Sequence, residues 1–197
     1  MKPFATSSDV NSYRYRSRDT ASLAKAADIK EPDHRLNPIF FQLPASPLMA
    51  AEVLQKTVDM EMVTKEFGSL KKKYDFTVVE GIGGVMVPIT KKISLLDVMK
   101  RMKLPTIIVS SPRLGSINHT ILTINACKVK KIPILGVIFN QMPKNPSIVE
   151  SMTPNYIERL TDTSTSVIPF MDDCNFKKVA TYLEKTSTIK KIISRLT

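Results

Sequence analysis

The chain lacks several features that would place it in other classes of protein. No run of about 18 or more apolar residues occurs in its 197 residues, so no segment has the length of a membrane-spanning helix. Residues 1–19 contain no continuous apolar stretch and do not read as a signal peptide. The two cysteines, Cys127 and Cys174, are too few for a disulfide framework and lack metal-ligand spacing. We therefore expect a cytoplasmic protein with reduced thiols and no membrane association.

Positive charge is in excess. Lysine and arginine number 29 against 18 acidic residues, a formal net charge of +11, which raises the question of nucleic-acid binding. The clusters at 71–73 and 128–131, however, directly precede apolar runs, where helices are expected to end and cations complement the helix dipole. No RNA-recognition signature or zinc-finger spacing accompanies them. The pattern favours a solvated basic surface, which would also attract an anionic substrate, over a nucleic-acid partner.

Short apolar runs alternate with longer amphipathic stretches from Tyr74 onward. The apolar runs are predicted to be strands: Phe76–Glu80, Pro105–Ser110, Ile134–Phe139 and Ser166–Pro169. The amphipathic stretches are predicted to be helices: Ser94–Met102, Ile117–Lys131, Ile148–Leu160 and Phe176–Leu196. Pro154 should break or kink the third helix, and the fourth should be interrupted near Ser187. Nearly continuous apolar strands are typical of parallel strands that are buried on both faces.

The first 70 residues are less regular. We predict a helix over Asp19–Ala27, an extended segment over Asn37–Phe41, and a helix from about Leu48 after a turn-rich loop. Strands that alternate with helices of this length indicate βαβ units. The sequence therefore predicts an α/β fold with a doubly wound, mostly parallel sheet, built as a single domain over residues 1–197.

Polar side chains follow three of the predicted strands, at the edge where open α/β sheets bind their ligands. Glu80 and a glycine-rich turn follow the first strand, Arg113–His119 follows the second, and Asn140 with Gln141 follows the third. Glycines allow backbone amides to approach a phosphate closely. A carboxylate at the end of a buried strand is costly unless it is paired or binds a metal. Glu80 is therefore either a magnesium ligand or a capping or ion-paired glutamate.

Five segments carry a resemblance to a known family. Val78–Ile89 is similar to the VEGAGG…P segment of dethiobiotin synthetases, and Arg113–Thr123 is similar to their LGTINHTLLT segment. Gly136–Asn140 resembles their GVI-x-N strand, Lys2–Thr6 their KPV-[AE]-[ST] strand end, and Asn37–Pro47 their NP…PxSP segment. Each likeness is weak alone, but together they keep their order across nearly the whole chain.

The resemblance implies a sheet of the P-loop NTPase type, a homodimer, and a ligase of biotin biosynthesis that requires ATP and Mg²⁺. Such a ligase closes a cyclic urea from carbon dioxide and 7,8-diaminononanoate. One amine captures carbon dioxide as a carbamate, the carbamate oxygen takes the γ-phosphoryl group, and the second amine then attacks and expels phosphate. Catalysis of this kind depends on positioning and charge neutralisation. The implied partners are these small molecules, without nucleic acid or membrane.

The resemblance also assigns roles to individual residues. Lys2 corresponds to the catalytic lysine that neutralises charge on the carbamate and the transferring phosphoryl group. Asp19 and Glu80 correspond to carboxylates that bind Mg²⁺ and ATP, although Asp19 could equally be a helix N-cap. The implied substrate contacts are Thr6, Arg113, Ser116 and Asn118. The implied nucleotide contacts are Gly81, Ile82, Gly83, Asn140, Gln141, Ile168, Pro169 and Phe170. Caps, turns and packing explain the same residue types without the family, and His119 is expected to be buried or capping.

The chain departs from the family at Ile82, where the family usually has alanine, and more seriously in the absence of a P-loop. The family carries a P-loop, G-x-x-x-x-G-K-[ST], whose backbone amides and lysine hold the ATP phosphates. No such pattern occurs here, and six glycines leave no substitute loop. The resemblance thus implies a fold that lacks its first strand–loop–helix unit, roughly 35 residues. This puts the activity of the chain as written in doubt, and an upstream start and a genuinely shortened protein are both open.

Two other functions compete with dethiobiotin synthetase. The first is a catalytically inactive, P-loop-less domain of the same fold that binds a nucleotide or a partner, and it should bind Mg-ATP weakly or not at all. The second is a related amidoligase such as those of corrinoid synthesis. The short chain and the segment Arg113–Thr123 disfavour the amidoligase.

Overall fold

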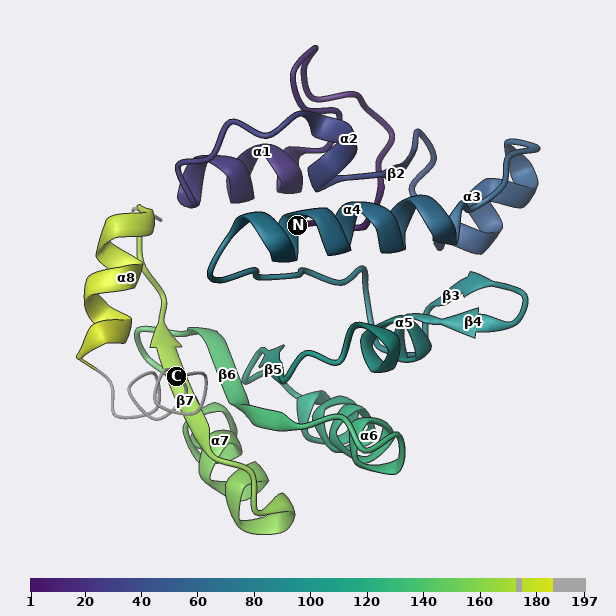
Figure 1. Cartoon of the computed structure of the whole chain (residues 1–197). Helices are drawn as coiled ribbons and strands as arrows, with labels where there is room; N and C mark the ends of the chain where they lie inside the picture. Colours follow the sequence, from purple (N-terminus) through teal and green to yellow (C-terminus); the bar gives the residue numbers. More distant parts are fainter. Residues whose placement is uncertain (173–174, 186–197) are drawn as a thin grey trace. The chain divides into compact units, whose positions relative to one another are not determined.

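The computed structural model describes residues 1–172 and 175–185 (Figure 1). The chain divides into two compact units, Met1–Val98 and Met99–Thr197, which are described separately. Each unit contains helices and parallel strands, which confirms the predicted α/β class. The single domain over residues 1–197 stays a prediction. Among the described residues, no helix combines the length and apolar character needed to span a bilayer.

The first unit is built on two short parallel strands. Strand β1 (Phe4–Thr6) pairs with β2 (Ile39–Phe41) in a register that sets Phe4 against Ile39. Four helices lie in the chain around them: α1 (Arg18–Ala26), α2 (Asp33–Leu36), α3 (Pro47–Val53) and α4 (Met60–Lys73). An antiparallel hairpin of β3 (Pro88–Thr90) and β4 (Ile93–Ser94) then leads into α5 (Leu95–Met102). Helix α3 contacts both parallel strands, and α2 contacts α4.

The ends of the helices follow from local sequence. Ser17 is the N-cap of α1, where its hydroxyl accepts a hydrogen bond from Thr20 N, so an N-cap role for Asp19 is wrong. Helix α4 begins after the N-cap Asp59 and ends at Lys73, with basic residues 71–73 in its last turn. The expectation that this lysine cluster lies at a helix C-terminus is confirmed.

The strand predicted over Phe76–Glu80 is not formed as a strand. Met1 N donates to the Val78 carbonyl at 2.7 Å, and Glu80 N donates to the Met1 carbonyl at 2.9 Å. These two bonds have the connectivity of a single rung of a parallel ladder. One rung does not extend into a strand, and Phe76 and Val78 are largely exposed rather than buried. The predicted strand is therefore wrong, because backbone pairing is available at one position only.

The second unit contains a three-stranded parallel sheet in the order β5–β6–β7. The strands are β5 (Thr106–Ser110), β6 (Ile134–Met142) and β7 (Thr165–Pro169). Helices α6 (Ser116–Val129) and α7 (Ile148–Thr161) contact the sheet and each other, which confirms the predicted strand–helix alternation. Buried side chains from strands and helices form the core: Ile108, Ile124, Val137, Phe139 and Ile157.

Two details of the second unit differ from the prediction. Strand β6 continues past Phe139 to Met142, because Met142 pairs with Pro169 of β7. Pro154 does not break α7, which runs through it to Thr161. A proline removes one N–H donor from a helix. Here the loss is outweighed by a complete capping box at Ser147 and by the burial of Pro154 itself.

The C-terminal helix is described in part. Helix α8 (Phe176–Glu184) contacts β7, and the remainder of the predicted helix to Leu196 lies outside the described residues. Cys127 is a buried free thiol whose pKa is raised by burial, and Cys174 lies outside the described residues.

Candidate functional site

Lys2 is the centre of a charged cluster in the first unit. Its side chain is only 6% exposed, and Nζ lies 2.7 Å from Glu80 Oε1 and 3.0 Å from Asp19 Oδ2. Nζ also donates to the Gly81 carbonyl oxygen at 2.8 Å. Three acceptors match the three N–H donors of an ammonium. The structure therefore brings together the lysine and both carboxylates that the sequence singled out.

The two carboxylates remain open to solvent. Asp19 is 55% exposed and Glu80 47% exposed, although both are paired with the buried ammonium. The Met1 ammonium also interacts with Glu80, and the exposed oxygens of both carboxylates can accept a further cation. No group of three or more His, Cys, Asp or Glu side chains in the described residues is placed to hold a metal. Mg²⁺ is often bound through one or two carboxylates and completed by water and phosphate, so this donor set fits it.

Backbone contacts hold each member of the cluster in place. The Lys2 N–H donates to the Leu36 carbonyl at 2.7 Å, and Glu80 is tied to Met1 as described above. Asp19 lies in the first turn of α1, where its charge also complements the helix dipole. The side chains thus meet because three separate segments of the chain hold their backbones in place.

Packing and backbone conformation favour glycine at two positions of the turn after Glu80. A Cβ atom at Gly81 would come within 2.8 Å of the Leu95 side chain, and Gly83 has a φ of +59°, in the left-handed region. Ile82 between them is half-buried. Packing and backbone conformation therefore account for these glycines, and contact with phosphate remains a proposal.

An apolar pocket of about 260 Å³ lies beside Lys2 in the first unit. Its lining includes Leu23, Ala24 and Leu70, together with Thr20, whose buried hydroxyl oxygen has no hydrogen-bond partner in the structure. Most of the lining is apolar, and Lys2 and Thr20 are among its polar members.

The predicted nucleotide-binding residues of the second unit lie on neighbouring strands. Between the pairs Phe139–Val167 and Met142–Pro169, the two β6 residues Asn140 and Gln141 lie opposite the single β7 residue Ile168, so they form a bulge. Gln141 has a φ of +58°, and its N–H is bound by the Asn140 side-chain oxygen at 2.9 Å. Met142 pairs with Pro169, and its carbonyl accepts from Phe170 N at 2.7 Å. Asn140 and Gln141 are thus adjacent to the segment Ile168–Phe170, as expected of residues that share a ligand.

The predicted substrate-binding residues are divided between the two units. Thr6 is half-buried at the end of β1, where it pairs with Phe41. Arg113 and Asn118 are exposed around the start of α6, and Ser116 is its buried first residue, with a hydroxyl that has no partner in the structure. The N-cap of the helix is Gly115, which has a φ of +89° and no side chain that could cap the helix. His119 is exposed in the first turn of α6, so the expectation that it is buried or capping is wrong.

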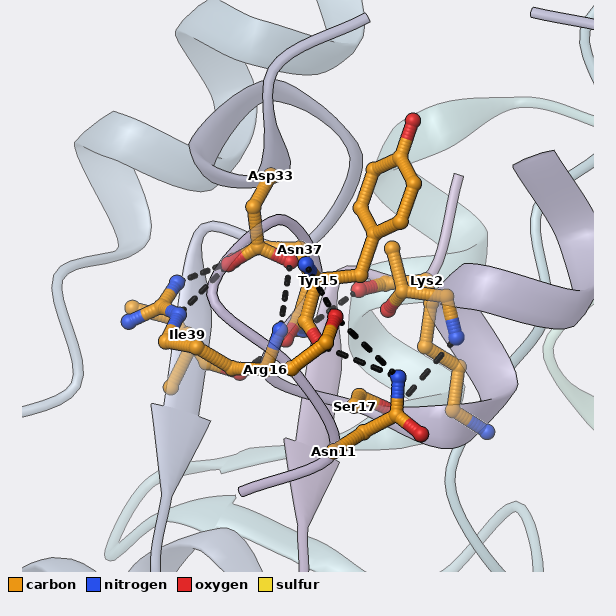
Figure 2. A network of polar contacts seen from close by, with 10 residues as sticks. Lys2, Asn11, Tyr15, Arg16, Ser17, Asp33, Asn37 and Ile39 are labelled. Atoms are coloured by element: carbon orange, nitrogen blue, oxygen red, sulfur yellow. Dashed lines mark hydrogen bonds and ion pairs between the residues drawn. The ribbon is translucent and has the colours of Figure 1, made fainter. Parts of the chain in front are cut away.

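Sequence reasoning missed two polar groups in the first unit. One surrounds Glu31, a carboxylate that is 4% exposed and is bound by Lys73, by the Tyr74 hydroxyl at 2.7 Å and by Arg35 at 3.3 Å. The hydrogen bond from Lys73 has the largest effect on Glu31, and together these bonds lower the pKa of its carboxyl group. The other surrounds Asn37 (Figure 2). The residues around Glu31 come from positions spread over about 40 residues, so they leave no local pattern in the sequence. Of the two groups, only the one around Asn37 had a sequence signal, the Asn-Pro dipeptide at positions 37 and 38.

Comparison with known proteins gives one consistent result. The model of a family described as AAA domain matches residues 1–184. The ATP-dependent dethiobiotin synthetase of Nitrosopumilus maritimus is 34% identical over 194 residues, which are 98% of this chain and 84% of that protein. The enzyme of the same name from Thermodesulfovibrio yellowstonii is 37% identical over 186 residues, 90% of this chain and 75% of its own length. The enzyme of the same name from Bacillus subtilis is 37% identical over 142 residues, which are 72% of this chain and 62% of that protein.

Proposed function

Because the chain belongs to the dethiobiotin synthetase family, we propose that it closes the ureido ring of dethiobiotin from carbon dioxide and 7,8-diaminononanoate, with ATP as co-substrate. The observation that carries this proposal is the convergence of Asp19 and Glu80 on the buried ammonium of Lys2. The three residues occupy the positions that the family resemblance assigns to catalysis and metal binding. The family model described as AAA domain matches residues 1–184, so that match includes every proposed site residue.

In this reaction one substrate amine attacks carbon dioxide and loses a proton, which gives a carbamate. A carbamate oxygen attacks the γ-phosphorus of ATP, the bond to the bridging oxygen breaks, and ADP leaves. The second amine then attacks the carbonyl carbon, and phosphate leaves as the ring closes. Negative charge accumulates on the carbamate and the phosphoryl oxygens, and a fixed ammonium stabilises such charge without reorganising.

We assign that role to Lys2. Asp19, Glu80 and Gly81 hold its ammonium in a single position, so the charge is in place before the substrate arrives. Asp19 and Glu80 are also the residues that would hold Mg²⁺, which supplies charge neutralisation to the ATP phosphates when bound. Their half-exposed carboxylates have room for both partners.

Further roles follow the family positions. Asn140 and Gln141, with Ile168–Phe170, are proposed to contact the nucleotide, and Ile82 and Gly83 the phosphates. Thr6, Arg113, Ser116 and Asn118 are proposed to contact the diamine substrate. A homodimer and a cytoplasmic location are part of the same proposal, and sedimentation equilibrium tests the first.

Two measurements on the chain test the proposal. Isothermal titration with Mg-ATP measures binding, and mass spectrometry of dethiobiotin formed from ¹³C-bicarbonate measures turnover. Labelled dethiobiotin is the expected product. Binding without product would leave the non-catalytic nucleotide-binding domain, and failure of both would contradict the ligase and favour a partner-binding role.

A further inference from the structure

Asn37 connects the two backbone segments that carry the ion pair between Lys2 and Asp19. Its side chain is fully buried, and Nδ2 donates to the Lys2 carbonyl at 2.8 Å and to the Ile39 carbonyl at 3.0 Å. Its own carbonyl accepts from the Arg16 guanidinium at 2.9 Å. Figure 2 shows Lys2, Arg16 and Ile39 gathered around this residue.

Arg16 directly precedes Ser17, the N-cap of the helix that carries Asp19. Its guanidinium is held in turn by Asp33, in the first turn of α2. One residue thus binds the start of β1 through its side chain and the start of α1 through its carbonyl and Arg16. Without the contacts of Asn37, Lys2 and Asp19 could move independently of each other.

The sequence around Asn37 explains why a side chain, and not the backbone, donates these hydrogen bonds. Pro3 follows Lys2 and Pro38 follows Asn37, and proline has no backbone N–H. The start of the β1–β2 pair is therefore short of backbone donors, and the Asn37 amide supplies two hydrogen bonds to carbonyls on opposite strands. Among the described residues the Asn37 side-chain oxygen has no hydrogen-bond partner, so the amide contributes its two N–H donors and not its acceptor.

We propose that Asn37 is a positioning residue for Lys2, which fixes the direction of the ammonium toward Asp19 and Glu80. The consequence for catalysis rests on the proposed function, but the positioning itself is a property of the folded chain. Asn37 does not touch the ammonium, so it acts only through the Lys2 backbone.

The test measures the reactivity of the Lys2 amine. The isosteric variant Asn37→Asp removes both N–H donors and sets an ionised carboxylate against two carbonyls. Tyr15→Phe is the matched control, because it deletes another buried hydrogen bond, from the Tyr15 hydroxyl to the Glu31 carbonyl, without contact to Lys2. Each protein is acetylated with an N-hydroxysuccinimide ester at conditions of equal unfolded fraction, and peptide mass spectrometry gives the rate at each lysine.

In Asn37→Asp we expect Lys2 to react about tenfold faster than in the wild type, on the scale of losing two hydrogen bonds. The rate at Lys2 should be unchanged in Tyr15→Phe, as should the rate at exposed lysines in both. Equal rates at Lys2 in Asn37→Asp and Tyr15→Phe would overturn the proposal, since Asn37 would then be merely structural. Should Asn37→Asp not fold, Asn37→Ser serves instead, because its hydroxyl cannot reach both carbonyls.

Turnover separates this proposal from the proposed function. In a chain that forms dethiobiotin, Asn37→Asp should lower kcat about tenfold or more while KM for ATP changes about twofold or less. If the wild type forms no product, the proposed function fails, and the acetylation rates still decide whether Asn37 positions Lys2.

Discussion

At the scale of single residues, the ammonium of Lys2 is the group on which the charged cluster depends. Its removal leaves Asp19 and Glu80 facing each other across the space it occupied, and their repulsion would separate them. We also propose that this fixed positive charge stabilises the negative charge on the transferring phosphoryl group. The effect of losing Lys2 should therefore be seen in catalysis more than in nucleotide binding.

Lys2→Ala should lower kcat for dethiobiotin formation by about 100-fold or more, the usual scale for loss of one preorganised electrostatic contact. KM for ATP should change much less, because other groups hold the nucleotide. Steady-state kinetics measure both constants. Lys72→Ala, at an exposed position in the last turn of α4, is the control and should behave as the wild type. Unchanged kcat in Lys2→Ala would remove the assigned role.

Gly83 and Gly84 form a matched pair for testing the turn after Glu80. Gly83→Ala should lower the free energy of unfolding by about 1 kcal/mol, because its φ of +59° disfavours a side chain and the new Cβ would lie 3.0 Å from Val87. A Cβ at Gly84 meets nothing within 4 Å, so Gly84→Ala should be nearly neutral. Urea denaturation measures the difference, and equal effects of the two variants would contradict the structure.

At the scale of elements, the capping box of α7 explains how the helix tolerates its internal proline. The Ser147 hydroxyl accepts from Glu150 N, and the Glu150 carboxylate accepts from Ser147 N at 2.8 Å. Ser147→Ala should cost about 1 kcal/mol, as N-cap deletions commonly do. Thermal unfolding followed by circular dichroism measures this. In a Pro154→Ala background, Ser147→Ala should lower the melting temperature by less, because a helix without the proline depends less on its cap.

The Glu31 group fixes the C-terminal end of α4. Its bonds lower the pKa of Glu31 from the ordinary value of 4.5, and the bond to Glu31 raises the pKa of Lys73. A carboxyl whose pKa is lower in the folded state stabilises the fold fully at higher pH. That contribution is lost as the pH falls from the ordinary pKa toward the folded-state pKa.

Glu31→Gln should therefore lower the free energy of unfolding by about 1–3 kcal/mol at pH 7, the usual range for hydrogen bonds to a charged group. The difference from the wild type should stay constant down to about pH 5 and shrink below the ordinary pKa of 4.5. Urea titrations across this range measure it. Asp75→Asn, at an exposed position, is the control. A difference that grows on acidification would have the wrong sign.

At the scale of the whole molecule, the sequence predicts one domain, and cooperativity tests this. Ile124 is fully buried in the core of the second unit, and Ile124→Ala should cost about 2–5 kcal/mol. If the chain is a single domain, Ile124→Ala should lower the free energy of exchange of the slowest-exchanging α4 amides, in the first unit, by the same amount. Native-state hydrogen exchange measures both. Leu122→Ala, exposed on the same helix, is the control, and loss confined to the second unit would indicate two domains.

Sequence and structure agree best where structure is local. The strands β5 and β7 and the helices α5 and α6 lie within a residue or two of their predicted bounds, because burial of an apolar face leaves its period in the sequence. The short hairpin β3–β4 was not predicted, and of the helix α4 only its C-terminal end at residues 71–73 was expected. The apolar residues of α4 are few, and Val63, Phe67 and Leu70 are its only buried positions.

The sequence by itself determined the α/β alternation, the family, and the identity of Lys2, Asp19 and Glu80 as candidate site residues. It could do so because motifs and periodic burial are properties of neighbouring residues. Only the tertiary structure decided that these three charges meet, that Phe76–Glu80 pairs at one rung, and that Asn37 holds the backbone of Lys2. Those outcomes depend on distances between residues far apart in the chain, and such distances are fixed by packing and pairing rather than by any local pattern.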